Sequence, residues 1–134
     1  MFRSLLSSRG FIFLLLIFWM SVIFFFSSLS GKEAAGPPTL AYYLERKGAH
    51  VFEYAVLMFL SFRYLHLCFY RETISRLILS AGAFALMYGA TDELHQYFVP
   101  LRGARMSDVL IDGLGILLAA IVIALFYRNK NRPK

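Results

Sequence analysis

Long apolar blocks separated by short polar segments constrain the fold of this chain more than any other feature. In the first block, Phe11–Phe26, sixteen residues pass without a charge and Ser21 is the only polar side chain. A helix needs about 20 apolar residues to cross the hydrocarbon core of a bilayer. Hydrophobic residues make up 59% of the chain, compared with roughly 45–50% in a soluble domain. The sequence therefore predicts a single all-α domain, a bundle of four transmembrane helices at about 11–29, 44–70, 74–98 and 108–127.

The first block has an alternative interpretation. Ser28-Leu29-Ser30 offers the small residues of a signal-peptide cleavage site, in which case Phe11–Ser30 would be removed. The apolar run is longer than the usual apolar region of a signal peptide, and further membrane segments follow it. A retained first helix is therefore favoured.

The distribution of charge indicates a membrane protein rather than a nucleic-acid-binding one. The net charge is +6, but the Lys and Arg residues lie at the ends of the apolar blocks, as membrane anchors do. Four helices place both termini on one side of the membrane. That side carries nine Lys and Arg, and the opposite loops carry five. The positive-inside rule therefore predicts that both termini are cytoplasmic. The single cysteine, Cys68, excludes an internal disulfide and a cysteine zinc cluster.

Polar residues gather near the predicted outer ends of three helices. The segment Thr91–Gly115 holds four of the eight acidic residues, although charge at the edge of hydrocarbon is costly. Residues three or four apart share a helix face, and Glu93 is displaced from Asp92 by about 100°. Three such stripes occur: Lys47, His50 and Glu53 or Tyr54; Asp92, His95 and Gln96; Asp108, Asp112 and Gly115. We expect the stripes to converge on a shared polar pocket, because each polar group then finds a partner inside the bundle.

Two interpretations of this pocket involve its basic residues. In the structural one, carboxylates pair with Lys47, Arg102 and Arg105, join the helix ends and carry out no chemistry. In the other, the same three residues bind a phosphate or pyrophosphate headgroup. His50 or His95 is then the general base or nucleophile, and a neighbouring carboxylate orients the imidazole.

A third interpretation is a metal site. His50 and Glu53 lie one helical turn apart, as do Asp92 and His95, and such pairs resemble half-sites of carboxylate-bridged metal bundles. Nearby arginines compete for these carboxylates, so we rank a metal below a phosphate headgroup and assign no metal or other cofactor.

Three motifs carry a resemblance to a known family. They are Lys47-x-x-His50-x-x-Glu53-Tyr54, Asp92-Glu93-Leu94-His95-Gln96-Tyr97-Phe98-Val99-Pro100-x-Arg102 and Asp108-x-x-x-Asp112-x-x-Gly115. In this order and spacing they resemble the VanZ-like family of small bacterial membrane proteins, named for a member linked to resistance to the glycopeptide teicoplanin. The resemblance covers most of the chain and implies a four-helix protein of the cell envelope. Leu101 stands where the family usually has Gly, and Arg105 matches no motif position, so only Arg102 is carried over.

We therefore predict a multi-pass protein of the bacterial inner membrane whose outer pocket binds an anionic lipid or a phosphate-bearing envelope component. Lys47 and Arg102 would hold the anion. The candidate acid/base residues are His50 and His95, with Glu53, Asp92 and Glu93 setting their protonation. The remaining candidate ligand-binding residues are Tyr54, Gln96, Asp108 and Asp112, and the two aspartates are expected to position Arg102 and the last helix.

Two alternatives stay open. One is a membrane-embedded enzyme that hydrolyses a headgroup, with or without a metal, using His50 and His95. The other is a non-enzymatic membrane factor, in which the polar residues are structural or alter how a glycopeptide reaches its target. The expected partners are membrane lipids and, beyond these, a lipid-linked cell-wall precursor or a glycopeptide.

Overall fold

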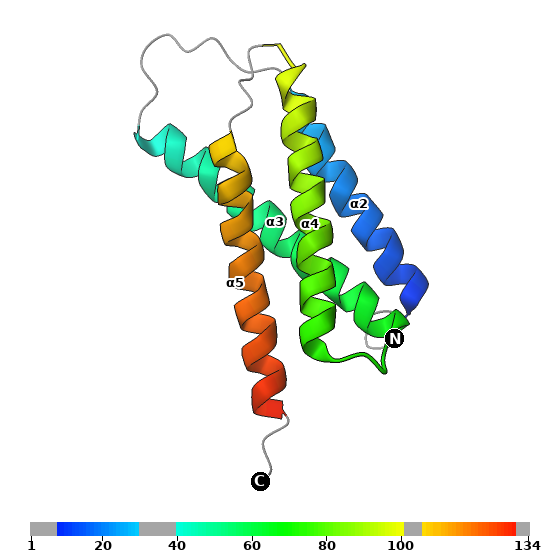
Figure 1. Ribbon diagram of the computed structural model, residues 1–134. Helices are drawn as coiled ribbons and strands as arrows, with labels where there is room; N and C mark the ends of the chain where they lie inside the picture. The colour runs from blue at the N-terminus through cyan, green and yellow to red at the C-terminus, as the bar shows by residue number, and fades with distance from the viewer. Residues whose placement is uncertain (1–7, 30–39, 101–105, 131–134) are drawn as a thin grey trace.

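The described part of the chain forms a bundle of four helices. The computed structural model describes residues 8–29, 40–100 and 106–130, and these ranges contain α2 (Arg9–Ser28), α3 (Leu40–Cys68), α4 (Ile74–Tyr97) and α5 (Met106–Lys130) (Figure 1). Each of the four is long and apolar enough to cross a membrane. The predicted all-α fold with four membrane-spanning helices is therefore confirmed.

The helix ends follow local chemistry. Ser8 caps α2 by accepting a hydrogen bond from the Phe11 amide, and Thr73 caps α4 by accepting one from the Arg76 amide, each at 3.4 Å. A side-chain oxygen at this position satisfies an amide that has no partner within the helix. Pro100 follows the end of α4 at Tyr97, as expected for a residue that cannot continue a helix.

The helix bounds differ from the prediction by one to four residues at one or both ends, with the largest differences in α3 and α5. α3 begins at Leu40 rather than near residue 44, so the last four residues of the expected loop, 40–43, are helical. Nothing in that stretch breaks a helix, whereas the Gly-Pro-Pro segment before it does. α5 runs from Met106 to Lys130, beyond the expected 108–127, because its polar ends also have good helix propensity and the last turn carries Arg128 and Lys130.

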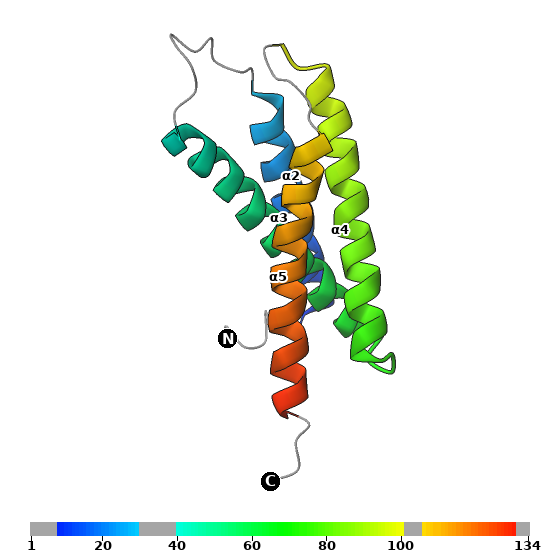
Figure 2. The ribbon, with the colours of Figure 1, turned by 60° about the vertical axis from the view of Figure 1, so that its left-hand side comes forward.

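Helix α3 is the centre of the bundle. It runs obliquely across the other helices and packs against α2, α4 and α5, and α5 also packs against α4 (Figures 1 and 2). Large apolar side chains such as Leu79 and Leu110, each 74% exposed, point away from the bundle. A lipid-facing surface of this kind is expected for a chain whose solvent is the bilayer. The buried apolar core includes Leu57, Met58, Ala81, Ala85, Ile116 and Ile123.

Helix α2 is joined to both of its neighbours by hydrogen bonds. The Trp19 indole Nε1 donates to the backbone carbonyl of Glu53 on α3 at 2.9 Å, and the Tyr88 hydroxyl of α4 donates to the carbonyl of Met20 at 2.7 Å. Aromatic side chains with a polar atom need such a partner when they are buried among apolar groups. These two bonds fix α2 against α3 and α4.

The backbones of helices α3 and α5 approach each other closely at Gly115. A Cβ atom at this position would overlap the Val51 carbonyl oxygen and would lie 3.1 Å from the Ala55 amide nitrogen. Both neighbours are backbone atoms of α3 and cannot rotate away. Small residues allow two helix backbones to approach closely in a membrane, and here only glycine leaves enough room.

This contact gives the first prediction. Gly115→Ala is expected to lower the free energy of unfolding by about 1–3 kcal/mol, because the added methyl group must push α5 away from α3. Gly48→Ala is the matched control, since a Cβ there meets nothing within 4 Å and alanine favours the helix. Reversible unfolding of both variants in mixed detergent micelles measures the difference. Equal effects of the two substitutions would contradict the packing described here.

Candidate functional site

The bundle has a group of buried polar side chains, which we call the polar cluster. It comprises His50, Tyr54, Asp92, Glu93, Gln96, Asp108 and Asp112, none of which is more than 9% exposed. The residues come from the first half of α3, the last turns of α4 and the first turns of α5. These segments lie at the same end of the bundle, opposite the start of α2 and the end of α5 (Figure 1). At least one polar residue from each of the three predicted stripes therefore lies in the cluster at this end of the bundle.

The central residues of the cluster lie at one depth. The apolar spans begin at Arg46 on α3 and Ser107 on α5, and the span of α4 ends at Tyr97. His50, Glu93 and Asp112 are four or five residues inside these limits, which is about 6–8 Å along each helix axis. Equal depth on three neighbouring helices explains why their side chains meet.

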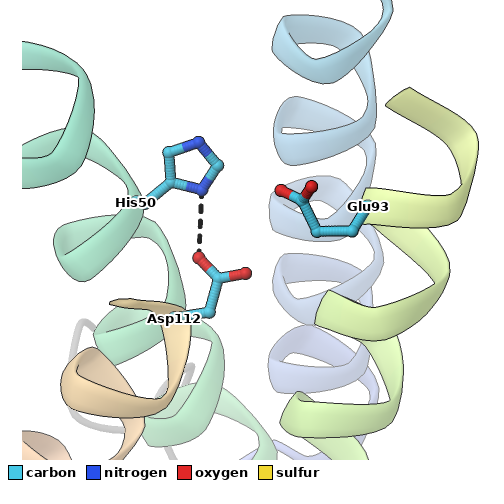
Figure 3. Close-up of side chains that lie close together, drawn as sticks. All are labelled: His50, Glu93 and Asp112. Carbon is cyan, nitrogen blue, oxygen red and sulfur yellow. Dashed lines mark hydrogen bonds and ion pairs between the residues drawn. The ribbon is translucent and has the colours of Figure 1, made fainter. Parts of the chain in front are cut away.

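The shortest contact in the cluster joins His50 and Asp112. His50 Nδ1 lies 3.0 Å from Asp112 Oδ1, and the two side chains are 9% and 1% exposed (Figure 3). With its proton on Nδ1, His50 donates this hydrogen bond and keeps the lone pair of Nε2. Glu93 extends from α4 toward the same pair, and one ligand atom from each of the three residues lies within 4.8 Å of the others (Figure 3).

Further polar groups surround this trio. Gln96 Nε2 donates to Asp92 Oδ2 at 2.9 Å on the inner face of α4. On α5, Ser107 Oγ donates to Asp108 Oδ1 at 3.2 Å. Asp92 and Asp108 are both close enough to Asp112 for their charges to act on it. The buried part of the cluster is therefore rich in carboxylates.

Gly89 leaves room on α4 for two residues of the cluster, Tyr54 and Asp112. A Cβ atom on this residue of α4 would lie 3.1 Å from Tyr54 Cε1 and 3.2 Å from Asp112 Oδ2. Both distances are shorter than ordinary van der Waals contacts. Because glycine has no Cβ, the tyrosine ring and the carboxylate can pack against α4 at this position. Gly89 was not among the predicted site residues. Gly89 precedes Glu93 by four residues and therefore lies on the same helix face, which is the sequence feature that could have indicated its place in the cluster.

His95 is turned away from the trio. Its ring stacks on Phe24 of α2 with the centroids 4.6 Å apart, and its Nε2 lies 3.0 Å from Ser28 Oγ. The structure therefore does not bring His95 together with His50. In place of the Asp92 and His95 half-site that the metal interpretation considered, Asp92 is hydrogen-bonded to Gln96, and Glu93 and Asp112 gather around His50.

The remaining predicted site residues lie at the edge of the cluster or beyond the described part of the chain. Lys47 is exposed one turn before His50, and Glu53 is partly buried on α3, where its carbonyl accepts the hydrogen bond from Trp19. Arg102 and Arg105 lie outside the described residues. The roles predicted for these four residues stay predictions.

Comparison with known proteins identifies the family of the chain. A model of the VanZ/LLP1 family matches residues 11–127, which is most of the chain. The chain belongs to the VanZ/LLP1 family. The predicted VanZ-like resemblance is thus confirmed, and the matched region contains the whole polar cluster. Searches of curated proteins and of solved structures gave no match.

The His50–Asp112 contact gives the second prediction. His50→Ala is expected to cost about 3–5 kcal/mol of unfolding free energy, because it leaves the Asp112 carboxyl buried without its partner. When Asp112→Ala is added, the combined loss should fall short of the sum of the two single losses by about 1–3 kcal/mol. Unfolding in mixed micelles measures all three variants.

His66→Ala is the control for this cycle, since His66 lies near the other end of α3 among Phe62 and Tyr127. Distant substitutions add within about 0.5 kcal/mol. The His66 and Asp112 substitutions should therefore be additive. Additivity between His50 and Asp112 would show that the pair does not interact.

Proposed function

We propose that this VanZ/LLP1 protein binds the headgroup of a phosphate-bearing lipid at the end of the bundle that carries the polar cluster. The observation that carries the proposal is the position of Lys47, which is exposed next to the first residue of the α3 span, Arg46. A lysine at this level lies where lipid phosphates lie. His50 and the rest of the cluster follow about one helical turn deeper.

The chemistry of the cluster defines the kind of headgroup. Phosphate would be held by Lys47, and Arg102 would add a second contact. Four of the seven cluster residues beneath are carboxylates, which accept hydrogen bonds, and the least buried of these is Asp108 at 9% exposed. A headgroup that continues into hydroxyl or amino groups would donate hydrogen bonds to such acceptors. An undecaprenyl-linked sugar and an amino phospholipid both have this combination.

The distribution of basic residues supports an outer-leaflet position for this end. Within the described ranges, the end with the start of α2 and the end of α5 carries more of the Lys and Arg residues: Arg9, Arg63, Arg71, Arg76, Arg128 and Lys130. The cluster end carries Arg46 and Lys47 there. Basic residues concentrate on the cytoplasmic side of membrane proteins. The cluster would then face outward from a bacterial inner membrane.

A second candidate function is hydrolysis of the bound headgroup, and the His50–Asp112 contact favours it. A carboxylate that accepts the Nδ1 proton holds the imidazole in the tautomer whose Nε2 can accept a proton. His50 would then be the general base and Asp112 its positioning residue. His95, stacked on α2, would contribute to headgroup contacts rather than to proton transfer.

A link to glycopeptides follows from the same ligand class. Teicoplanin resistance would result if the bound lipid were a cell-wall precursor, or if the protein altered the access of a glycopeptide to it. Expression in a susceptible bacterium should then lower teicoplanin sensitivity, and Lys47→Gln should abolish that effect. Unchanged sensitivity with the wild-type protein would leave lipid binding without this consequence.

The third prediction concerns lipid binding. Native mass spectrometry of the full chain should show a bound phosphate-bearing lipid, and Lys47→Gln should weaken its binding about tenfold through loss of one charge-assisted contact. Arg76→Gln is the control, because Arg76 is exposed at the other end of the bundle. Diacylglycerol, which lacks phosphate, should not compete. Equal retention by the Lys47 and Arg76 variants would contradict the proposal.

An assay for headgroup release distinguishes hydrolysis from binding alone. His50→Ala should abolish headgroup release while the lipid remains bound, provided that the variant is folded. Binding without any turnover in the wild-type protein would favour the non-enzymatic alternative.

The fourth prediction concerns orientation. A reporter fused after Lys134 should be active in the cytoplasm, and a cysteine introduced at Lys47 should react with a membrane-impermeant thiol reagent added from outside. Cys68→Ser removes the native thiol and serves as the background for this labelling. Labelling of position 47 only after the cells are opened would reverse the proposed orientation.

A further inference from the structure

We propose that His50, Glu93 and Asp112 form a binding site for one divalent transition-metal ion. The site lies between α3, α4 and α5, and each helix supplies one ligand (Figure 3). It goes beyond headgroup binding, because the metal would bind whether or not a lipid is present. One nitrogen and two carboxylate oxygens of this kind are ligands that zinc and manganese both accept.

The distances fit a common ion. Ligand atoms bound at about 2.1 Å are separated by about 3.0 Å when they lie at right angles, as in octahedral manganese sites, and by about 3.4 Å in a tetrahedral zinc site. His50 Nδ1 and Asp112 Oδ1 already lie 3.0 Å apart. The three ligand atoms lie within 4.8 Å of one another, so a rotation of the Glu93 carboxylate brings the third ligand into range.

Buried oxygen atoms give independent support. Asp112 is 1% exposed, and its second oxygen, Oδ2, has no hydrogen-bond partner among the described residues. Figure 3 shows this oxygen on the side of Asp112 that faces Glu93. A buried carboxylate oxygen without a partner is costly. A cation between the two carboxylates would satisfy it.

The tyrosine beside the trio also lacks a partner. Tyr54 is fully buried, and its hydroxyl has no hydrogen-bond partner in the part of the chain that the structure describes. Tyr54 Cζ and Asp112 Oδ2 both lie within 3.4 Å of the point where Gly89 would carry a Cβ. The phenol is thus placed to donate to a metal-bound carboxylate or to a metal-bound water. Such outer partners orient the ligands of metal sites.

The charge of the trio matches a divalent cation. A neutral imidazole with two ionised carboxylates has a net charge of −2, which is expensive to bury in a bundle surrounded by lipid. A divalent ion would neutralise it. Neutral His50 has two tautomers, and the one with its proton on Nε2 leaves the Nδ1 lone pair for the metal. The same trio can therefore exist as a hydrogen-bonded pair or as a metal site.

The presence of an imidazole selects among metals. Calcium and magnesium prefer oxygen ligands alone, whereas zinc and manganese accept nitrogen and carboxylate oxygen together. We therefore expect Zn²⁺ and Mn²⁺ to bind at least tenfold more tightly than Ca²⁺ or Mg²⁺. A bound ion would also place positive charge beneath Lys47, which would make the acidic cluster compatible with a phosphate ligand.

The experiment uses the full-length protein in detergent, treated with chelator and then titrated with Zn²⁺ or Mn²⁺ alone. Calorimetry should show one ion per chain. Glu93→Gln and His50→Ala should each weaken binding about 100-fold, because each removes one of three ligands. Glu72→Gln and His66→Ala are the matched controls, since both residues lie toward the opposite end of the bundle.

Thermal unfolding gives a second readout. A saturating metal should raise the unfolding temperature of the wild-type protein and of both controls by about 5 °C or more, since it binds only the folded state. The same metal concentration should raise the unfolding temperature of Glu93→Gln much less, because its binding is about 100-fold weaker. Glu93→Gln keeps the His50–Asp112 hydrogen bond, so it remains informative even if His50→Ala does not fold.

Three results would overturn the metal site. They are no binding at one ion per chain, equal binding by Glu93→Gln and Glu72→Gln, and tighter binding of Ca²⁺ than of Zn²⁺. None of them bears on lipid binding, which is measured without metal through Lys47→Gln. Conversely, metal binding with no retained lipid would leave this inference standing and contradict the proposed function.

Discussion

The close approach of α3 and α5 at Gly115 is the contact on which the rest of the bundle depends. Val51, whose carbonyl touches the glycine, is next to His50 in the chain, and Asp112 is less than one turn before Gly115. The same crossing therefore sets the 3.0 Å separation between His50 and Asp112. A bulkier residue at position 115 would widen the crossing and separate the two side chains, so packing and site geometry are one property here.

The geometry of the His50–Asp112 contact matters because lipid surrounds the bundle. A polar side chain that turns away from the bundle meets hydrocarbon, where it has no hydrogen-bond partner. The cluster residues therefore have to satisfy one another or a bound ion or ligand. Asp92 meets Gln96, and Asp112 meets His50. Within the described ranges, the oxygens of the cluster that have no such partner include the Tyr54 hydroxyl, Asp92 Oδ1, Gln96 Oε1 and Asp112 Oδ2. Because some polar atoms of the cluster have hydrogen-bond partners and others have none among the described residues, we expect a cation at its centre.

The sequence predicted the fold well because its apolar blocks have the length of a bilayer. It also predicted that polar stripes on three helices would meet. It predicted their partners less well. The buried residues Gly89, Asp92, Glu93 and Gln96 define a face of α4 centred between Asp92 and Glu93, and at 100° per residue His95 falls at the edge of that face. Spacing alone grouped Asp92 with His95. In the structure His95 packs against α2 instead. A contact between two helices cannot be predicted from the spacing of residues within one of them.

The separation of the His50–Asp112 pair along the chain has a consequence for biogenesis. The two residues are 62 positions apart, on the second and the last of the four helices. A chain that enters the membrane in order would hold His50 and then Glu93 in the bilayer before Asp112 arrives. Until then these groups would have to be shielded by water, by the insertion machinery or by lipid headgroups. Completion of the cluster would coincide with insertion of the final helix, so a truncated chain would carry unfinished polar surfaces that quality-control proteases can recognise.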